Sequence, residues 1–207
     1  PTSGLAANPT LGEVSDKIVS MGGTSILSET SELVGTEEIL APRCVNDEVA
    51  KKLLGIIKDN EEYFEKLGES LRDGNPSAGN KEGGLTTLEE KSLGCIHKAG
   101  YSPITEVYAY GEMVDKKGLV VMDTPGQDIA SIAAMVAGGA QVVIFTTGRG
   151  TPTGNGIVPV IKITGNAETA QLMEDNIDYD ASGIITGDKT IEETGKELFD
   201  ILMDVVN

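Results

Sequence analysis

The chain has 207 residues, an apolar content of 39% and a formal net charge of −17. This length is enough for one domain with its own hydrophobic core. The acidic balance argues against nucleic acid or an anionic membrane as a partner. No stretch has the apolar length of a membrane span, and the N-terminal residues do not resemble a signal peptide. We therefore expect a cytoplasmic protein, in which the distant Cys44 and Cys95 remain reduced thiols.

The predicted elements alternate between helices and short apolar strands. A helix begins near Asn8, and a buried strand follows at 24–29. A short helix at 36–41 precedes a long acidic helix at 47–70, for which Asn46 is the expected N-cap. A glycine-rich loop then leads into a helix at 87–98.

The second half of the chain continues this alternation. Strands are predicted at 104–110 and 118–123, with VDKKG (114–118) as a hairpin turn between them. Further elements are predicted as a helix at 130–138, strands at 141–147 and 157–164, and helices at 167–175 and 191–206. The pattern predicts a single α/β domain over 1–207, three-layer and with a mainly parallel sheet. It is Rossmann-like but lacks the glycine-rich dinucleotide-binding motif.

In sheets of this kind, ligands bind beyond the carboxyl ends of the strands. Three polar segments follow predicted strands: SETSE (28–32), DTPG (123–126) and TTGRG (146–150). The loop and helix start at 75–94, NPSAGNKEGGLTTLEEKSLG, form a fourth candidate segment. These four segments concentrate carboxylates, hydroxyls and glycines, so we expect them to form a binding site.

A nucleotide phosphate is an unsuitable ligand for the 75–94 segment. Gly74 to Lys81 is close to a P-loop, but Asn80 occupies the position of the required lysine. Lys81 comes one residue late, and Glu82 stands where a magnesium-binding hydroxyl is needed. The loop also follows an acidic helix instead of a buried strand, which excludes the P-loop interpretation.

The residue types in the four segments suit a polyhydroxylated carboxylic acid. Thr and Asn side chains can bind hydroxyls, and lysine or arginine can bind carboxylates. Glu29, Glu32 and Asp123 are candidate ligands of a hard divalent ion. Thr86 has a structural alternative as a helix cap, with Glu89 completing a capping box. His97 lies at a helix end, where a surface or dipole-related role is the commoner one.

Four blocks of the sequence resemble the altronate/galactarate dehydratase family. They are SGLAANPTLG…GGTSILSETSEL (3–33), GNPSAGNKEGGLTTLEEKSLG (74–94), VVMDTPG (120–126) and FTTGRGTPTGN (145–155). The blocks extend over nearly the whole chain, and the one at 74–94 is the longest continuous block. The chain is similar to the C-terminal portion of such an enzyme, which implies an N-terminal domain or subunit as a partner.

The resemblance implies a hydro-lyase that converts a hexonate or hexarate to a 2-keto-3-deoxy acid with a divalent metal, typically Fe²⁺. Ligands of that metal are expected to include residues upstream of this chain. Lys91, Glu29 and Glu32 are the candidate catalytic residues. The candidate substrate-binding residues are Asn80, Lys81, Thr86, Thr87, Asp123, Thr124, Thr147 and Arg149.

Two other functions are open at this point. The same family resemblance extends to the large subunit of sulfolactate sulfo-lyase, in which sulfite leaves instead of water. The chain could also be a non-catalytic module that binds a sugar acid. The sequence leaves the substrate's stereochemistry and a homo-oligomeric state undetermined.

Overall fold

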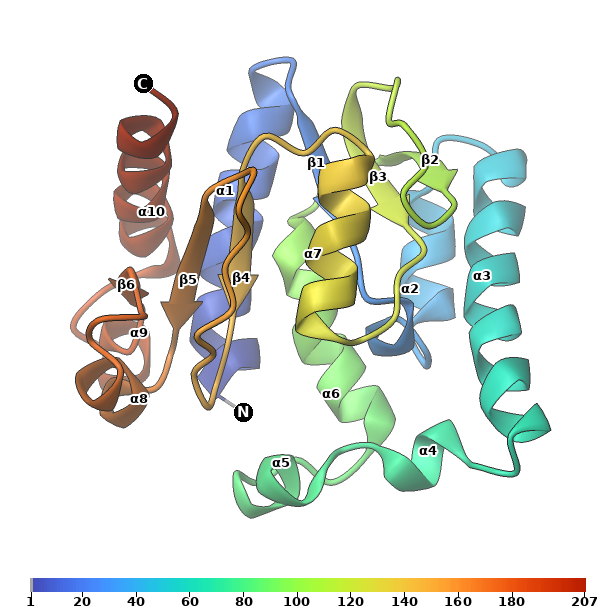
Figure 1. The fold of residues 1–207 in the computed structure, drawn as a ribbon, viewed down its shortest axis with the longest axis horizontal. Coiled ribbons are helices and arrows are strands. Elements are labelled where there is room, and N and C mark those ends of the chain that lie inside the picture. The colour runs from blue at the N-terminus through green and yellow to red at the C-terminus, as the bar shows by residue number, and fades with distance from the viewer. Residues whose placement is uncertain (1) are drawn as a thin grey trace.

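The computed structural model describes residues 2–207 and contains two small parallel sheets. The first has the order β1-β3-β2, and the second has the order β4-β5-β6. The strands are β1 (Thr24–Leu27), β2 (Ile104–Tyr108), β3 (Gly118–Met122), β4 (Val143–Thr146), β5 (Val160–Thr164) and β6 (Tyr179–Asp180). The expected α/β fold with parallel strands is confirmed (Figure 1).

Helices cover both faces of the sheets, giving the three layers that the sequence predicts (Figure 1). The longer ones are α1 (Asn8–Ser20), α3 (Asp47–Lys66), α6 (Leu88–Cys95), α7 (Asp128–Ala137) and α10 (Ile191–Val206). Short α-helical segments are α2 (Glu37–Leu40), α4 (Leu71–Gly74), α5 (Ala78–Glu82), α8 (Ala167–Leu172) and α9 (Gly183–Thr186). Tighter or wider turns are η1 (Ser3–Ala7), η2 (Thr30–Glu32), η3 (Ala41–Arg43) and η4 (Ile96–Ala99).

Strand β3 shows why the middle layer is apolar. Leu119 and Val121 pack in the same hydrophobic cluster as residues of α3 and α6. The alternate residues, Val120 and Met122, pack in a second cluster with α7. Because successive side chains of a strand point to opposite faces, a strand covered on both sides must be apolar throughout. A third cluster joins β5 to α1 and α10.

The predicted hairpin between the second and third strands is wrong. Strand β2 pairs with β3 in parallel, with Val107 opposite Val121, so the connection must return along the sheet. Tyr108 fixes this return: its hydroxyl donates to Asp115 Oδ1 at 2.6 Å and accepts from the Lys116 amide at 3.0 Å. The turn-forming residues of VDKKG therefore end a crossover loop.

Other element boundaries differ in detail from the predictions. Asn46 is the N-cap of α3, as expected, and its side chain accepts a hydrogen bond from the Val49 amide. The helix ends at Lys66, however, and the short α4 follows it. Helix α5 lies within the predicted loop, and neither β6 nor α9 was predicted. No helix within residues 2–207 is both long and apolar enough to cross a membrane.

The strand order reverses between β1 and β4. One sheet extends from β1 through β3 to β2, and the other extends from β4 through β5 to β6. Such a reversal is the position at which open α/β sheets bind ligands, beyond the carboxyl ends of their strands. In Figure 1, α4 and α5 lie along this side of the molecule, below the ends of the strands.

Candidate functional site

The carboxyl ends of β1 and β3 are joined by hydrogen bonds between side chains and backbone. Glu29 follows β1 with φ of +69°, a left-handed conformation that is uncommon for a residue other than glycine. Its amide donates to Thr124 Oγ1 at 2.8 Å. Thr30 Oγ1 donates to Asp123 Oδ1 at 2.5 Å, and the Thr30 amide donates to the Thr124 carbonyl. The strained backbone of Glu29 is thus held by the neighbouring strand end.

Four charged side chains meet beside this junction, and we call them the Glu29–Lys98 cluster: Glu29, Glu32, Lys91 and Lys98. Lys98 Nζ donates to Glu32 Oε2 at 2.8 Å and to Glu29 Oε2 at 3.3 Å. Lys91 Nζ lies 3.5 Å from Glu32 Oε1. The side chains of Glu29, Glu32 and Lys98 are only 13%, 17% and 17% exposed. Charges buried this deeply need oppositely charged partners, because an unpaired charge is costly to remove from water.

The two carboxyl groups of the cluster have opposite electrostatic environments. Burial, reinforced by the negative charge of Glu32, raises the pKa of Glu29 to about 7. Burial also acts to raise the pKa of Glu32, but the ammonium groups of Lys98 and Lys91 outweigh it and hold that pKa well below its usual value. Burial would lower the pKa of Lys98, yet the two carboxylates raise it. Glu29 is therefore suited to gain and lose a proton near neutral pH, while Glu32 stays ionised.

Three of the four predicted segments line one small cavity of about 320 Å³. Ser31 and Glu32 come from 28–32, Asn75 and Lys91 from 75–94, and Gly126 from 123–126. Lys91 Nζ donates to Asn75 Oδ1 at 3.4 Å within this cavity. Segments that are distant in sequence thus line one cavity, and the volume of this cavity lies within the range of small-molecule sites.

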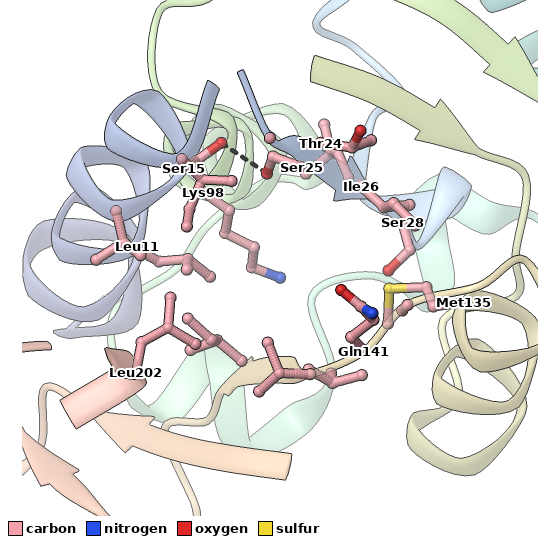
Figure 2. Close-up of a pocket in the computed structure, with 18 of the residues that line it drawn as sticks. Leu11, Ser15, Thr24, Ser25, Ile26, Ser28, Lys98, Met135, Gln141 and Leu202 are labelled. Carbon is pink, nitrogen blue, oxygen red and sulfur yellow. Dashed lines mark hydrogen bonds between the residues drawn. The ribbon is translucent and has the colours of Figure 1, made fainter. Parts of the chain in front are cut away.

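A larger cavity of about 640 Å³ lies between β1 and β4 and borders the other end of the cluster. Glu29, Lys98 and Thr146 are among its lining residues, so the fourth segment, 146–150, reaches this cavity. Figure 2 shows the Lys98 side chain extending into it from the side of α1. The Glu29–Lys98 cluster therefore separates two cavities at the strand ends.

The predicted hydroxyls of the 75–94 segment have local partners. Thr87 is the N-cap of α6, and its Oγ1 accepts from the Glu90 amide at 3.1 Å. Glu90 Oε2 accepts from both the amide and the hydroxyl of Thr86. The predicted capping box of Thr86 and Glu89 is therefore wrong, because Thr87 is the N-cap and the Glu90 carboxylate bonds to Thr86. The binding roles of Thr86 and Thr87 stay predictions.

The remaining predicted binding residues lie around the same strand ends. Asn80 and Lys81 belong to α5, where Lys81 is exposed. Gly79 of this helix packs against the Arg149 guanidinium, whose Nη1 would lie only 2.7 Å from a Cβ at that position. Thr147 Oγ1 accepts from the Gly150 amide and so shapes the turn that presents Arg149. Contact of these residues with a substrate stays a prediction.

The candidate ligands of the described chain do not by themselves form a metal centre. Within residues 2–207, no three His, Cys, Asp or Glu side chains converge so that they could hold a metal ion. Glu29 and Glu32 face Lys98, and Asp123 accepts from Thr30. These three candidate ligands therefore bond to protein groups in the described part of the chain.

Lys98 was not predicted from the sequence, yet it forms ion pairs with both Glu29 and Glu32. It lies in η4, next to His97, which is exposed as expected. No local sequence signal marks Lys98, because its partners Glu29 and Glu32 lie 69 and 66 positions earlier in the chain. Cys44 and Cys95 are both free thiols, as predicted.

The fold and this site define an α/β protein with a charged candidate ligand site at the point where the strand order reverses. The family described as D-galactarate/Altronate dehydratase, C-terminal, matches residues 1–207, and the chain belongs to this family. Altronate dehydratase of Bacillus subtilis (strain 168) is 45% identical over 191 residues, 92% of this chain and 38% of the relative. Galactarate dehydratase (L-threo-forming) of Escherichia coli (strain K12) is 43% identical over 205 residues, 99% of this chain and 39% of the relative.

A relative whose name gives a different activity is also similar over the full length of this chain. The (2R)-sulfolactate sulfo-lyase subunit beta of Chromohalobacter salexigens is 37% identical over 208 residues, 100% of this chain and 54% of that subunit. The chain thus spans less than half the length of the dehydratases and about half the length of the sulfo-lyase subunit.

Proposed function

We propose that this chain is the C-terminal part of a hydro-lyase that dehydrates a hexonate or hexarate, of the altronate or galactarate type, to a 2-keto-3-deoxy acid. The observation that supports it most is the meeting of Glu29, whose pKa is raised, with Glu32, whose pKa is lowered, and with two lysines at the site. Family membership supplies the class of reaction. The complete enzyme comprises this chain and the region that precedes it in the family.

Dehydration requires a base for the weakly acidic proton beside the substrate carboxylate and an acid for the departing hydroxyl. Glu29 suits this acid–base work, because its pKa of about 7 permits both protonation states at neutral pH. Lys91 is 3.5 Å from Glu32, an ion pair that suits charge neutralisation better than proton abstraction. We therefore assign proton transfer to Glu29 and binding of the developing negative charge to Lys91 and Lys98.

The divalent metal, typically Fe²⁺, stays part of the proposal for the complete enzyme. Because the described residues form no three-ligand cluster, ligands of that metal would come from the preceding region. When bound, such an ion would polarise the substrate carboxylate. We expect this chain alone to be inactive or weakly active for the same reason.

The test is a Glu29→Gln substitution in the complete enzyme, with release of 2-keto acid from altronate and from galactarate as the measurement. Loss of an acid–base group typically lowers turnover by roughly 10²- to 10⁴-fold. We expect a decrease in kcat of that order with little change in KM, because the amide keeps the shape of the side chain.

Glu38→Gln is the matched control, since Glu38 is exposed on α2 and no hydrogen bond or ion pair is found for its side chain within residues 2–207. The control is expected to turn over at the normal rate. Normal turnover by the Glu29 variant would remove Glu29 from the proposed mechanism. No 2-keto acid release by the unsubstituted enzyme from either substrate would remove the proposed function itself.

Sulfolactate cleavage is a second candidate function, favoured by the match over the full chain to a sulfo-lyase subunit. The same cluster would then stabilise negative charge while sulfite leaves. Sulfite release from sulfolactate, without 2-keto acid release from the sugar acids, distinguishes this reaction. Binding of a sugar acid without either product would instead indicate a non-catalytic module.

A further inference from the structure

The larger cavity runs along the edges of two strands. It is lined by the consecutive residues 24–29 of β1 and its extension, and by the consecutive residues 141–146 leading into and along β4. A cavity against one face of a strand would be lined by alternate residues, because side chains alternate between faces. We call this cavity the inter-sheet slot, and its two walls are strand edges.

Both walls have unpaired backbone groups. Within residues 2–207, strand β1 pairs with β3 alone and β4 pairs with β5 alone, so each is an edge strand on the side of the slot. Edge strands present N–H and C=O groups that another strand can pair with. In Figure 1 both strands run downward, with α7 in front of the space between them and α1 behind. The slot thus occupies the position of a strand in the middle layer.

The size of the slot agrees with one short strand. Strand spacing, layer thickness and rise together give roughly 160 Å³ per residue of a strand in a packed sheet. The slot volume of about 640 Å³ then corresponds to about four residues. Strands β1 and β4 are each four residues long, so the three lengths agree.

Both faces of the slot are mainly apolar, with Ser15 of α1 and Ser131 of α7 among the lining residues, and this specifies the chemistry of its occupant. Leu11 and Leu202 line it from α1 and α10, and Met135 lines it from α7 (Figure 2). Ile18 of α1 is a further apolar lining residue. A strand between these faces must be apolar at successive positions, as buried parallel strands are. Glu29 and Lys98 lie at the end of the slot, where such a strand would shield them from water.

We propose that an apolar strand of about four residues, from the region that precedes this chain in its family, inserts between β1 and β4 and joins the two sheets into one. The dehydratase relatives have ample sequence for this, since this chain covers only 38–41% of their length. The inserted strand pairs with both edges and forms one wall of the Glu29–Lys98 cluster. This inference is independent of which lyase reaction the enzyme performs.

Photo-cross-linking in the complete enzyme tests the insertion. A benzoylphenylalanine at Leu11, which is half-buried and extends into the slot, is expected to cross-link to one short apolar stretch of the preceding region. The same group at Ile129, which is 75% exposed on α7 and does not line the slot, is the control and is expected to give no such product. Gln141 provides a second slot position, exposed and beside β4, in case the Leu11 variant does not fold.

The identity of the cross-linked peptide decides the outcome. A peptide from the preceding region supports the proposal, whereas a peptide of this chain shows that the slot closes on itself. A product of twice the mass shows a second copy, and absence of any peptide product from both slot positions indicates an unfilled or ligand-filled cavity. Each of the last three results overturns the proposal.

Amide hydrogen exchange gives a second, label-free measurement. In the complete enzyme, the amides of β1 and β4 are expected to exchange on the order of tenfold or more slowly than those of β6 and of residues 106–108 of β2, because only the latter keep a free edge in the part of the chain that the structure describes. Ile104 of β2 is left out of the comparison, since it bridges to Cys44. Equal exchange of all four strands would contradict insertion.

Discussion

The strand-end site and the 75–94 segment both contain many polar side chains, but these form hydrogen bonds over very different sequence distances. Thr30 bonds to Asp123, and Lys98 bonds to Glu29 and Glu32, over separations of 93, 69 and 66 positions. The hydroxyls of Thr86 and Thr87 bond to Glu90, only four and three positions away. The first region is built by the tertiary fold, and the second by a helix start.

A polar, glycine-containing segment can thus be either a helix start or a region that the tertiary fold builds, and the sequence distance of its hydrogen bonds distinguishes the two. Local bonds of Thr and Glu stabilise the first turn of a helix and would form wherever that helix forms. Long-range bonds among buried charges exist only if the fold imposes them, at a cost that a purely structural region would avoid. Lys91 belongs to both regions, because it follows the capped turn and reaches Glu32. Substitutions can test whether the two regions differ in this way.

The largest effect is expected from removing the shared cation of the cluster. Lys98→Met leaves two buried carboxyl groups without their common partner, and such a loss typically costs about 3–5 kcal/mol in the free energy of unfolding. Urea denaturation of the 207-residue chain measures it. Lys58→Met is the control, because Lys58 pairs with Glu62 at the surface and is 75% exposed. If both variants have the same free energy of unfolding, the charge of Lys98 contributes no more to stability than that of an exposed lysine.

A second effect is expected in the pH dependence of stability. Glu29 has a folded-state pKa of about 7 against a usual value of 4.5, so the folded state binds more protons between these values. Stability is therefore fully present below about pH 4.5 and falls as pH rises toward 7, by about 3 kcal/mol at most. Glu32 acts in the opposite direction, since its lowered pKa makes stability fall as pH decreases below its usual value.

Denaturation midpoints measured from pH 4.5 to 7.5 check this sign. The Glu29→Gln variant is expected to lose the downward slope that the unsubstituted chain shows over this range. A slope that persists in the variant would place the titrating group elsewhere.

The general architecture was predictable from the sequence. Apolar runs such as GLVVM at 118–122 indicate strands buried on both faces, and their alternation with helices indicates a parallel sheet. The rule that ligands bind at strand ends then led to Glu29, Glu32 and Asp123. Helix capping by Asn46 was predictable because it depends only on near neighbours.

The parts that could not be predicted depend on distant contacts. The parallel pairing of β2 with β3 is fixed by Tyr108 and the crossover loop, whereas VDKKG alone has the composition of a hairpin turn. Lys98 has no distinctive motif, and its importance follows from two carboxylates more than 60 positions earlier. The two-residue strand β6 is too short to leave a periodic pattern.

A smaller effect is expected in the capped turn of the 75–94 segment. Thr87→Ala removes the N-cap of α6 and is expected to lower the free energy of unfolding by about 1 kcal/mol. Thr87→Asn restores a capping side chain and is expected to recover most of that stability. If Thr87 also binds substrate, the asparagine variant of the complete enzyme will regain stability while its KM remains raised. Recovery of both quantities would assign Thr87 to capping alone.

The smallest effect is expected at Lys81, which is exposed and forms no ion pair within residues 2–207. If it attracts a substrate carboxylate, Lys81→Ala in the complete enzyme raises KM by roughly two- to fivefold without changing kcat, the size typical of an exposed charge pair. Salt must weaken this effect, because exposed charges are screened within about 8 Å at physiological ionic strength. Lys51→Ala on α3 removes the same charge from another exposed position. An equal rise in KM for both variants would show that the overall charge of the chain, and not a contact in the 75–94 segment, governs substrate attraction.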